Sequence, residues 1–310
     1  MSINISKNLK YFFLLPAFLS LLSIFALATW GLKPGIDLAG GSLLQVSYLE
    51  GRPPVEQVRA LTETLAFGEV RVQPIGDNAY LLRQRDLSTD EKNQLEAVLG
   101  GLGPIHEDQF TSIGPTLGAE LMRKAWIAIV LVVLSTILFI AFAFRRVSGE
   151  SEKEKGGVSS WKYGVVAVLT LLHDILIPAG LFAFLGFMSG AEVDALFIVA
   201  LLTILGISIN DTIVIFDRIR ENLRLNSERH RHEAFELVVG RSISQTLARS
   251  ISTSLTVVIV LLALYFVGPV ATKDFALTLI VGMIAGTYSS IFLASPMLVV
   301  WERWSTRKKN

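Results

Sequence analysis

The sequence predicts a polytopic α-helical membrane protein with a small α/β domain between its first two spans. Hydrophobic residues make up 52% of the 310 residues, and the mean hydropathy is +0.54, as in multi-span membrane proteins. A polar segment with its own periodicity separates the first apolar run from the second. Six apolar runs reach the roughly 20 residues that cross a hydrocarbon core: 11–30, 125–144, 163–187, 195–216, 245–266 and 275–301.

The ends of these runs carry the aromatic belt that membrane spans need. All five tryptophans fall at or near a run end: Trp30, Trp126, Trp161, Trp301 and Trp304. The first run follows Lys7 and Lys10 and contains an Ala-Leu-Ala sequence that resembles a signal-peptide cleavage site. Its apolar stretch is longer than the signal core of about 7–15 residues. We therefore expect it to stay in the protein as a membrane anchor.

Composition argues against several classes of function. The chain has no cysteine, so it has neither a disulfide framework nor a thiolate metal site. Its four histidines show no zinc-ligand spacing. The net charge of +1 indicates no nucleic-acid partner. The sequence contains no Walker motif, catalytic triad or metal cage. We expect no cofactor, no metal and no enzymatic activity.

The distribution of Lys and Arg predicts the topology. The segments 145–162 and 217–244 and the tail 302–310 are rich in both, whereas 188–194 has neither and 268–274 has only Lys273. The positive-inside rule then places both termini in the cytoplasm and residues 31–124 outside it. The predicted parts are a first span within 1–30, an extracytoplasmic domain at 31–124, a five-span bundle at 125–301 and a cytoplasmic tail.

The segment between the first two spans reads as a ferredoxin-like βαββαβ domain. Alternating apolar residues predict strands, and 3.6-residue periodicity predicts helices. Gly76-Asp77-Asn78 is a turn signal between two strands, and the spacing of Ser88 and Glu91 is that of a helix capping box. In chain order the elements are a strand at 42–49, a helix at 54–65, strands at 69–73 and 79–83, a helix at 88–99 and a strand at 105–112.

A glycine-rich stretch, residues 35–41, stands at the entrance to this domain and is called the membrane-exit motif here. It contains Gly35, Asp37, Gly40 and Gly41. A phosphate-binding loop would need a following Lys-Ser/Thr and a helix, and neither is present. The motif therefore predicts a structural turn through which the chain leaves the membrane and begins a strand.

Three charges interrupt the apolar runs, and they direct the functional prediction. Asp174, Asp211 and Arg249 lie in three different runs, and a charge near the bilayer centre costs roughly 3 kcal/mol. With a rise of 1.5 Å per residue, Asp211 and Arg249 lie roughly 9 and 12 Å inside the neighbouring cytoplasmic charges. We expect all three to face the bundle interior, with Arg249 as the countercharge of Asp211.

Two interpretations of these charges stay open. An Asp–Arg pair with good hydrogen bonds can lock helices together without turnover, or an aspartate in a dry site can change its protonation state as its partner moves. Ser208 and Asn210 add polar character beside Asp211. His173 is a relay or a structural histidine, and consecutive helix positions are not expected to face each other.

Several motifs together resemble the SecF family, the smaller subunits of bacterial SecDF protein-export complexes in the resistance-nodulation-division superfamily. The resemblance covers nearly the whole chain. It rests on the membrane-exit motif and on four further segments: His173-Asp174, Gly206-Ile-Ser-Ile-Asn210-Asp211-Thr, Asp217-Arg218-Ile-Arg220-Glu221-Asn222 and Ser244-Gln-Thr-Leu-Ala-Arg249-Ser-Ile-Ser-Thr-Ser.

The resemblance implies a function and a set of partners. It implies pairing with SecD in the bacterial inner membrane and use of the proton-motive force to help preproteins leave the SecYEG channel after SecA has driven them in, with YajC as a further candidate partner. It implies proton coupling at Asp211 and Arg249 and, more weakly, at Asp174. A small-molecule or lipid exporter of the same superfamily and a non-conducting scaffold are the alternatives.

Overall fold

The structure is a computed structural model that describes residues 5–65, 67–68, 70–143, 160–230 and 233–307. The chain forms two compact units. The helical unit comprises Met1–Lys33, Ile127–Ala191 and Leu196–Asn310, and the sheet unit comprises Pro34–Trp126 and Glu192–Ala195. Some of the basic residues from which the topology is predicted lie outside the described residues: those in 145–159, Arg231, and the lysines at positions 308 and 309. Glu69 and His232 lie outside them as well.

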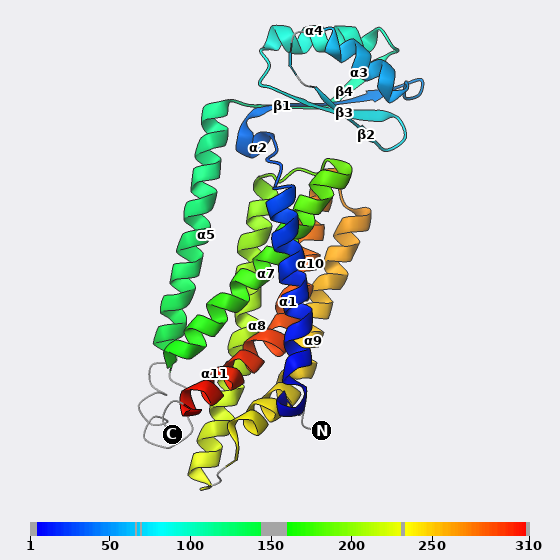
Figure 1. Cartoon of the computed structure of the whole chain (residues 1–310). Coiled ribbons are helices and arrows are strands. Elements are labelled where there is room, and N and C mark those ends of the chain that lie inside the picture. Colours follow the sequence, from blue (N-terminus) through cyan, green and yellow to red (C-terminus); the bar gives the residue numbers. More distant parts are fainter. Residues whose placement is uncertain (1–4, 66, 69, 144–159, 231–232, 308–310) are drawn as a thin grey trace. The chain divides into compact units, whose positions relative to one another are not determined.

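The described residues contain six helices that are long and apolar enough to cross a membrane, which confirms the predicted number. They are α1 (Ile5–Thr29), α5 (Pro115–Ala143), α7 (Ser160–Ser189), α8 (Ala195–Glu228), α9 (Phe235–Val267) and the last span (Figure 1). The last span is built from α10 (Lys273–Ser289), a π-helical turn (Ser290–Ala294) and α11 (Ser295–Arg307), after a short 3-10 helix (Val270–Thr272).

Small residues let the helices of the helical unit approach closely. A Cβ added at Gly180 in α7 would lie 2.4 Å from the Ser23 Cβ of α1, and one at Gly282 in α10 would lie 2.1 Å from the Ile204 Cδ1 of α8. Such contacts replace the hydrophobic driving force that is missing between helices in lipid. Gly282 and Gly286 form a small-xxx-small motif that packs α10 against Ile204 and Ser208 of α8. Gly206, in contrast, has no neighbour within 4 Å of an added Cβ.

A polar contact and aromatic contacts join the ends of α1 and α7. Lys33 donates a hydrogen bond of 2.6 Å from Nζ to the carbonyl of Gly186, one of the last carbonyls of α7, where a cation also suits the helix dipole. The rings of Trp30 and Phe187 stack with centroids 4.9 Å apart. The predicted aromatic belt residue Trp30 thus also fixes a helix pair.

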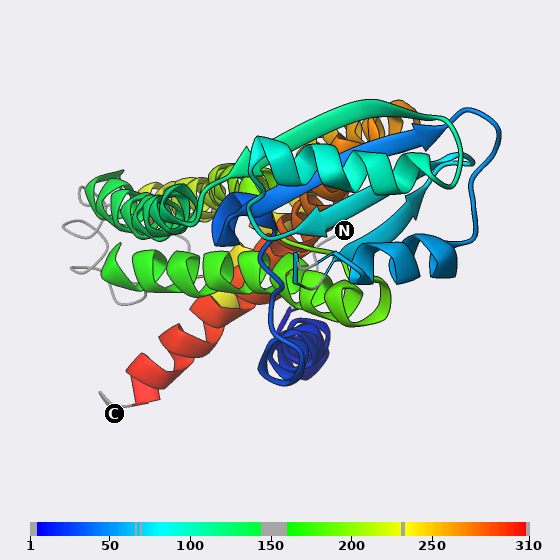
Figure 2. The same ribbon diagram turned by 90° about the horizontal axis from the view of Figure 1, so that it is seen from above.

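The sheet unit has the ferredoxin-like order predicted from the sequence. Its strands are β1 (Gly41–Tyr48), β2 (Arg71–Ile75), β3 (Ala79–Gln84) and β4 (Ile105–Ile113), in the spatial order β2-β3-β1-β4 with every neighbouring pair antiparallel. Helices α3 (Val55–Glu63) and α4 (Thr89–Gly100) lie side by side over one face (Figures 1 and 2). A short helix that the sequence did not indicate, α2 (Ile36–Ala39), precedes β1.

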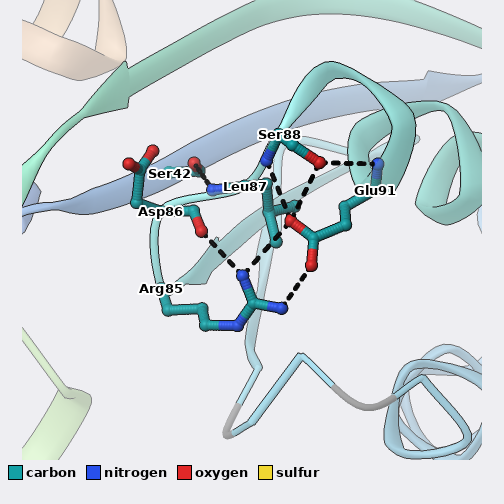
Figure 3. Close-up of polar contacts among 6 residues, drawn as sticks. All are labelled: Ser42, Arg85, Asp86, Leu87, Ser88 and Glu91. Carbon is teal, nitrogen blue, oxygen red and sulfur yellow. Dashed lines mark hydrogen bonds and ion pairs between the residues drawn. The ribbon is translucent and has the colours of Figure 1, made fainter.

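Alternate residues of the strands build the core under α3 and α4. Leu44, Val46 and Leu82 are fully buried against Leu95 and Leu99 of α4, as expected when successive side chains point to opposite faces. The predicted capping box at the start of α4 is present. The Ser88 hydroxyl accepts from the Glu91 amide, the Glu91 carboxylate accepts from the Ser88 amide, and Arg85 forms an ion pair with Glu91 (Figure 3).

Candidate functional site

Asp174 lies at the centre of a buried hydrogen-bond network in the helical unit. Its side chain is fully buried. One carboxylate oxygen lies 2.9 Å from the Nδ1 of His173, and the other accepts a hydrogen bond from the Ser208 hydroxyl of α8. The Nε2 of His173 lies 2.9 Å from the Tyr288 hydroxyl of α10. Three helices therefore contribute to the environment of this carboxylate.

The contact between His173 and Asp174 corrects the expectation that neighbouring helix positions do not meet. The backbone directs the two side chains about 100° apart around α7. Both side chains are long enough to turn toward the α8–α10 side, where Ser208 and Tyr288 hold them. Both side chains are buried, and a buried polar group costs free energy unless it is hydrogen-bonded, so each side chain takes a partner within reach.

Asp211 lies in a second, sparser network. It is 7% exposed, and in the described part of the chain its carboxylate accepts a hydrogen bond of 3.4 Å from the Ser254 hydroxyl of α9. Ser254 in turn accepts a hydrogen bond of 2.6 Å from Thr287 of α10. A single long hydroxyl contact is weak compensation for a buried carboxylate.

The two networks are neighbours along two helices. Ser208 and Asp211 are three residues apart on α8, which places them on one face, and Thr287 and Tyr288 are consecutive on α10. Irregular backbone borders both networks. Pro178 stands four residues after Asp174 and cannot donate to its carbonyl, and the π-helical turn at Ser290–Ala294 follows Tyr288 closely. Helix irregularities of this kind are frequent at functional sites.

Arg249 does not join these networks within this chain. Its side chain is exposed on α9, and no hydrogen bond or ion pair links it to Asp211 in the described part of the chain, although it lies within electrostatic range of that carboxylate. The expectation that all three charges face the interior of this chain's own bundle is therefore wrong for Arg249. The face of α9 that packs inward carries Ser250 and Ser254 instead.

Asn210 also points elsewhere than expected. It is exposed, and with Gly206 it lines a cleft of about 490 Å³ between α5 and α8. The other lining residues are mostly apolar: Leu131, Val132, Ser135, Thr136, Phe139, Ile209 and Ile213. Consecutive residues of a helix diverge by about 100°, and Asp211 takes the inward direction. Asn210 is therefore not part of the surroundings of Asp211.

The membrane-exit motif is a tightly packed turn in the sheet unit. Gly40 and Gly41 have φ of +79° and +140°, conformations that favour glycine. A Cβ at Gly40 would lie 2.8 Å from the Pro115 Cα, and one at Gly41 would lie 2.6 Å from the Gln84 carbonyl oxygen. Asp37 accepts a hydrogen bond from the Ala195 amide. The membrane-exit motif is therefore held by close backbone contacts at Gly40 and Gly41 and by the hydrogen bond of Asp37.

Sequence reasoning missed three hydroxyl residues of the site: Ser254, Thr287 and Tyr288. Ser, Thr and Tyr are common in membrane helices, where they bond to their own backbone, so their presence alone predicts nothing. The available signal was the grouping of Thr287 and Tyr288 directly after Gly286, the residue that brings α10 against Ser208. Among the described residues, no group of three or more His, Cys, Asp or Glu is placed to hold a metal ion.

The fold and the site together define a multi-pass membrane protein with a small ferredoxin-like domain and a buried, partly charged polar core. Two family models match the chain. The protein export membrane protein SecD/SecF C-terminal family matches residues 94–152 and 158–304, and the SecD/SecF GG motif matches residues 25–48. The second match contains the membrane-exit motif.

Full-length relatives and a solved structure agree with these matches. The chain is 40% identical to the protein translocase subunit SecF of Thermobaculum terrenum, over 94% of this chain and 91% of that protein. It is 35% identical to SecF of Synechocystis sp., over 99% and 97%. The crystal structure of SecDF from Thermus thermophilus, a translocon-associated membrane protein, matches with a TM-score of 0.83 and 32% identity, over 98% of this chain and 39% of that one. The chain belongs to the SecF family of protein translocase subunits.

Proposed function

We propose that this chain works with a SecD-like partner to promote protein export across the bacterial inner membrane, driven by the proton-motive force. The observation that carries the proposal is the state of Asp211, a carboxylate buried in an apolar span with one long hydroxyl contact and no ion pair in the described part of this chain. Structural carboxylates in membranes are normally paired or fully hydrogen-bonded. A weakly held one suits a group that gains and loses a proton.

Asp174 has the opposite character, which suggests a different part in the same process. Its carboxylate has a histidine on one oxygen and a serine on the other. A buried carboxylate with a partner on each oxygen is well compensated, so we assign to Asp174 the part of holding α7 and α8 together at the site. We assign proton exchange with the aqueous phases to Asp211.

Arg249 supports the assignment of a partner chain. With Ser252, Thr253 and Thr256 it forms an exposed polar stripe on α9, at positions i, i+3, i+4 and i+7 of an otherwise apolar span. An arginine in that position is costly in lipid, so we propose that a second membrane protein packs against this stripe. The solved SecDF chain, of which this chain spans 39%, is long enough to contain such a second half. We therefore propose SecD as the partner and Arg249 as the cation that gates Asp211.

The remaining assignments follow from the family and from the charge distribution. SecYEG and the emerging preprotein are the proposed further contacts, with SecA acting indirectly and YajC as an additional candidate. The Lys and Arg bias of the short connections favours cytoplasmic termini and a periplasmic segment 31–124. The protein is proposed to work without a cofactor or a catalytic residue.

The test is the exchange Asp211→Asn, measured as export stimulation by an imposed proton gradient in inner-membrane vesicles. Asparagine preserves the size of the side chain and its bond to Ser254, but it cannot titrate. We expect loss of at least nine-tenths of the gradient-dependent stimulation, with normal amounts of the protein in the membrane. Asp217→Asn is the matched control, because Asp217 is exposed and its ion pair with Arg220 is long, at 4.0 Å. Full stimulation in Asp211→Asn would remove Asp211 from the mechanism.

A further inference from the structure

The residues between α7 and α8 are attached to the small domain rather than to the helices that flank them. Glu192–Ala195 belong to the sheet unit, and α8 begins there, at Ala195, before continuing into the helical unit. Pro34 and Val193 form a parallel bridge, and the Gly35 amide donates a hydrogen bond of 2.8 Å to the Val193 carbonyl. The membrane-exit motif is therefore paired with the segment that leads into α8.

An ion-pair cluster strengthens this attachment. The Glu192 carboxylate lies 3.1 Å from Arg71 and 3.5 Å from Arg83, and its side chain is only 9% exposed. Arg71 on β2 and Arg83 on β3 are directly opposite each other in the sheet register, where like charges repel. Glu192 relieves that repulsion, so the two strands and the segment before α8 stabilise one another.

Asp37 fixes the first turn of α8. Its Oδ2 accepts a hydrogen bond of 3.2 Å from the amide of Ala195, the first residue of the helix. The first four amides of a helix have no partner within the helix, and a carboxylate there also suits the positive end of the helix dipole. Asp37 thus serves as an N-terminal cap that comes from another part of the chain.

The same motif fixes the start of α5. A Cβ at Gly118, in the first turns of α5, would lie 2.6 Å from the Gly40 amide nitrogen, and Gly40 itself leaves no room for a Cβ beside Pro115. Two glycines thus bring the membrane-exit motif into backbone contact with α5. One short motif, residues 35–41, consequently contacts the first turns of two different spans.

We propose that three contacts act together as a clasp: the Asp37 cap on Ala195, the hydrogen bond between Gly35 and Val193, and the ion pair between Glu192 and Arg83. The clasp transmits movement of the sheet unit to α8 and thereby positions Asp211. Asp211 lies 16 residues after Ala195 on the same helix, roughly 24 Å along its axis. Asp37 is then a positioning residue that carries no proton. The inference rests on the proposed role of Asp211 and extends it to the membrane-exit motif.

The first experiment compares Asp37→Ala with Asp37→Asn in the full membrane complex. Asparagine retains an oxygen that can accept from the Ala195 amide, whereas alanine does not. We expect amide exchange in residues 195–198 to be about fivefold faster in Asp37→Ala and near wild type in Asp37→Asn. Gradient-driven export stimulation should fall severalfold in Asp37→Ala and be retained in Asp37→Asn. Loss of stimulation in Asp37→Asn would overturn the proposal, because it would show that the ionisable group itself is needed.

Other outcomes of that comparison separate this inference from the proposed function. Unchanged amide exchange in Asp37→Ala, or faster exchange with full stimulation, would overturn the clasp while Asp211→Asn still abolishes stimulation. If Asp211→Asn itself retains stimulation, the proposed function fails, and the clasp fails with it as a device that positions Asp211. The exchange data then report only on the cap.

A disulfide provides a second test that does not depend on weakening the fold. The chain has no cysteine, so Pro34→Cys with Val193→Cys gives one defined pair at the parallel bridge. We expect the oxidised protein to retain gradient-driven stimulation, because the clasp stays closed while the sheet unit moves. Loss of stimulation on oxidation, with recovery on reduction, would overturn the proposal. Each single-cysteine variant under the same oxidant is the control.

Discussion

At the scale of single residues, the two buried aspartates differ in how completely their oxygens are bonded. Asp174 has a partner on each carboxylate oxygen, whereas Asp211 has one long contact with Ser254. A buried carboxylate with so little hydrogen bonding is sensitive to any cation that approaches or withdraws. The difference in hydrogen bonding, rather than depth in the membrane, is why we assign proton exchange to Asp211 and not to Asp174.

Arg249 leads to a prediction at this scale. Arg249→Met should change the free energy of unfolding of the isolated chain by no more than about 0.5 kcal/mol, because the side chain is exposed and has no ion pair within the described part of the chain. The same change should abolish gradient-driven stimulation and reduce copurification with a SecD-like chain. Chemical unfolding in detergent and affinity copurification from membranes measure the two effects.

The matched control for Arg249 is Arg224→Met, which removes an exposed arginine from the far end of α8. It should leave both copurification and stimulation unchanged. A loss of several kcal/mol in the isolated Arg249→Met chain would instead indicate a buried countercharge within this chain, as the sequence alone suggested.

At the scale of elements, the helices are positioned by a few close contacts rather than by their apolar surfaces. Lipid tails are as apolar as leucine, so tight packing at small residues has to select the neighbours of each helix. Gly180 does so for α1 and α7, and Gly282 and Gly286 do so for α8 and α10. The second pair also determines the site, because Gly286 packs against Ser208, the residue that bonds Asp174.

Gly282→Ala should therefore destabilise the bundle. The new methyl group would meet Ile204 well inside contact distance, and overpacking of this kind typically costs about 1–3 kcal/mol. The midpoint of thermal unfolding in detergent should fall, and Ile204→Ala in the same chain should restore part of the loss. Gly206→Ala is the control and should be neutral, since that position opens into free space. Equal effects of the two glycine changes would contradict this account of the packing.

The capping box of α4 gives a prediction about pH. The hydrogen bond from Arg85, together with the backbone and hydroxyl of Ser88, lowers the pKa of Glu91 from 4.5 to about 2. Because the folded pKa is below the unfolded one, the stability from Glu91 is present above about pH 4.5 and is lost as pH falls toward 2. Urea unfolding of a soluble fragment 34–114 should show a difference between wild type and Glu91→Gln at pH 5 that shrinks by pH 2.5. A constant difference across this range would show that Glu91 acts without its charge.

At the scale of the whole molecule, the sequence predicted what periodicity encodes and missed what tertiary contact decides. Six spans, the βαββαβ order and the capping box at Ser88 follow from local patterns, and all are present. The pairing of residues 192–195 with the sheet unit joins segments more than 100 residues apart, for which no local pattern exists. Tyr288 and Ser254 were missed for the same reason. Arg249 was expected to point inward because a charge is costly in lipid, but that cost does not say whether this chain or a partner chain covers the side chain.

The topology of the whole chain gives the last prediction. If the Lys and Arg bias sets the orientation, the β2–β3 turn at Asp77 faces the periplasm, and the far end of α8 at Arg224 faces the cytoplasm. Both residues are exposed, and the chain contains no cysteine, so a single introduced thiol reports on one position only. With an impermeant maleimide, Asp77→Cys should be labelled in cells whose outer membrane alone is permeabilised, and Arg224→Cys should be labelled only after lysis. The reverse pattern would invert the chain in the membrane. Asp211 lies roughly 9 Å along α8 from Asp217. In an inverted chain that end of α8 would face the periplasm, so protons could not reach Asp211 from the cytoplasm by this short path.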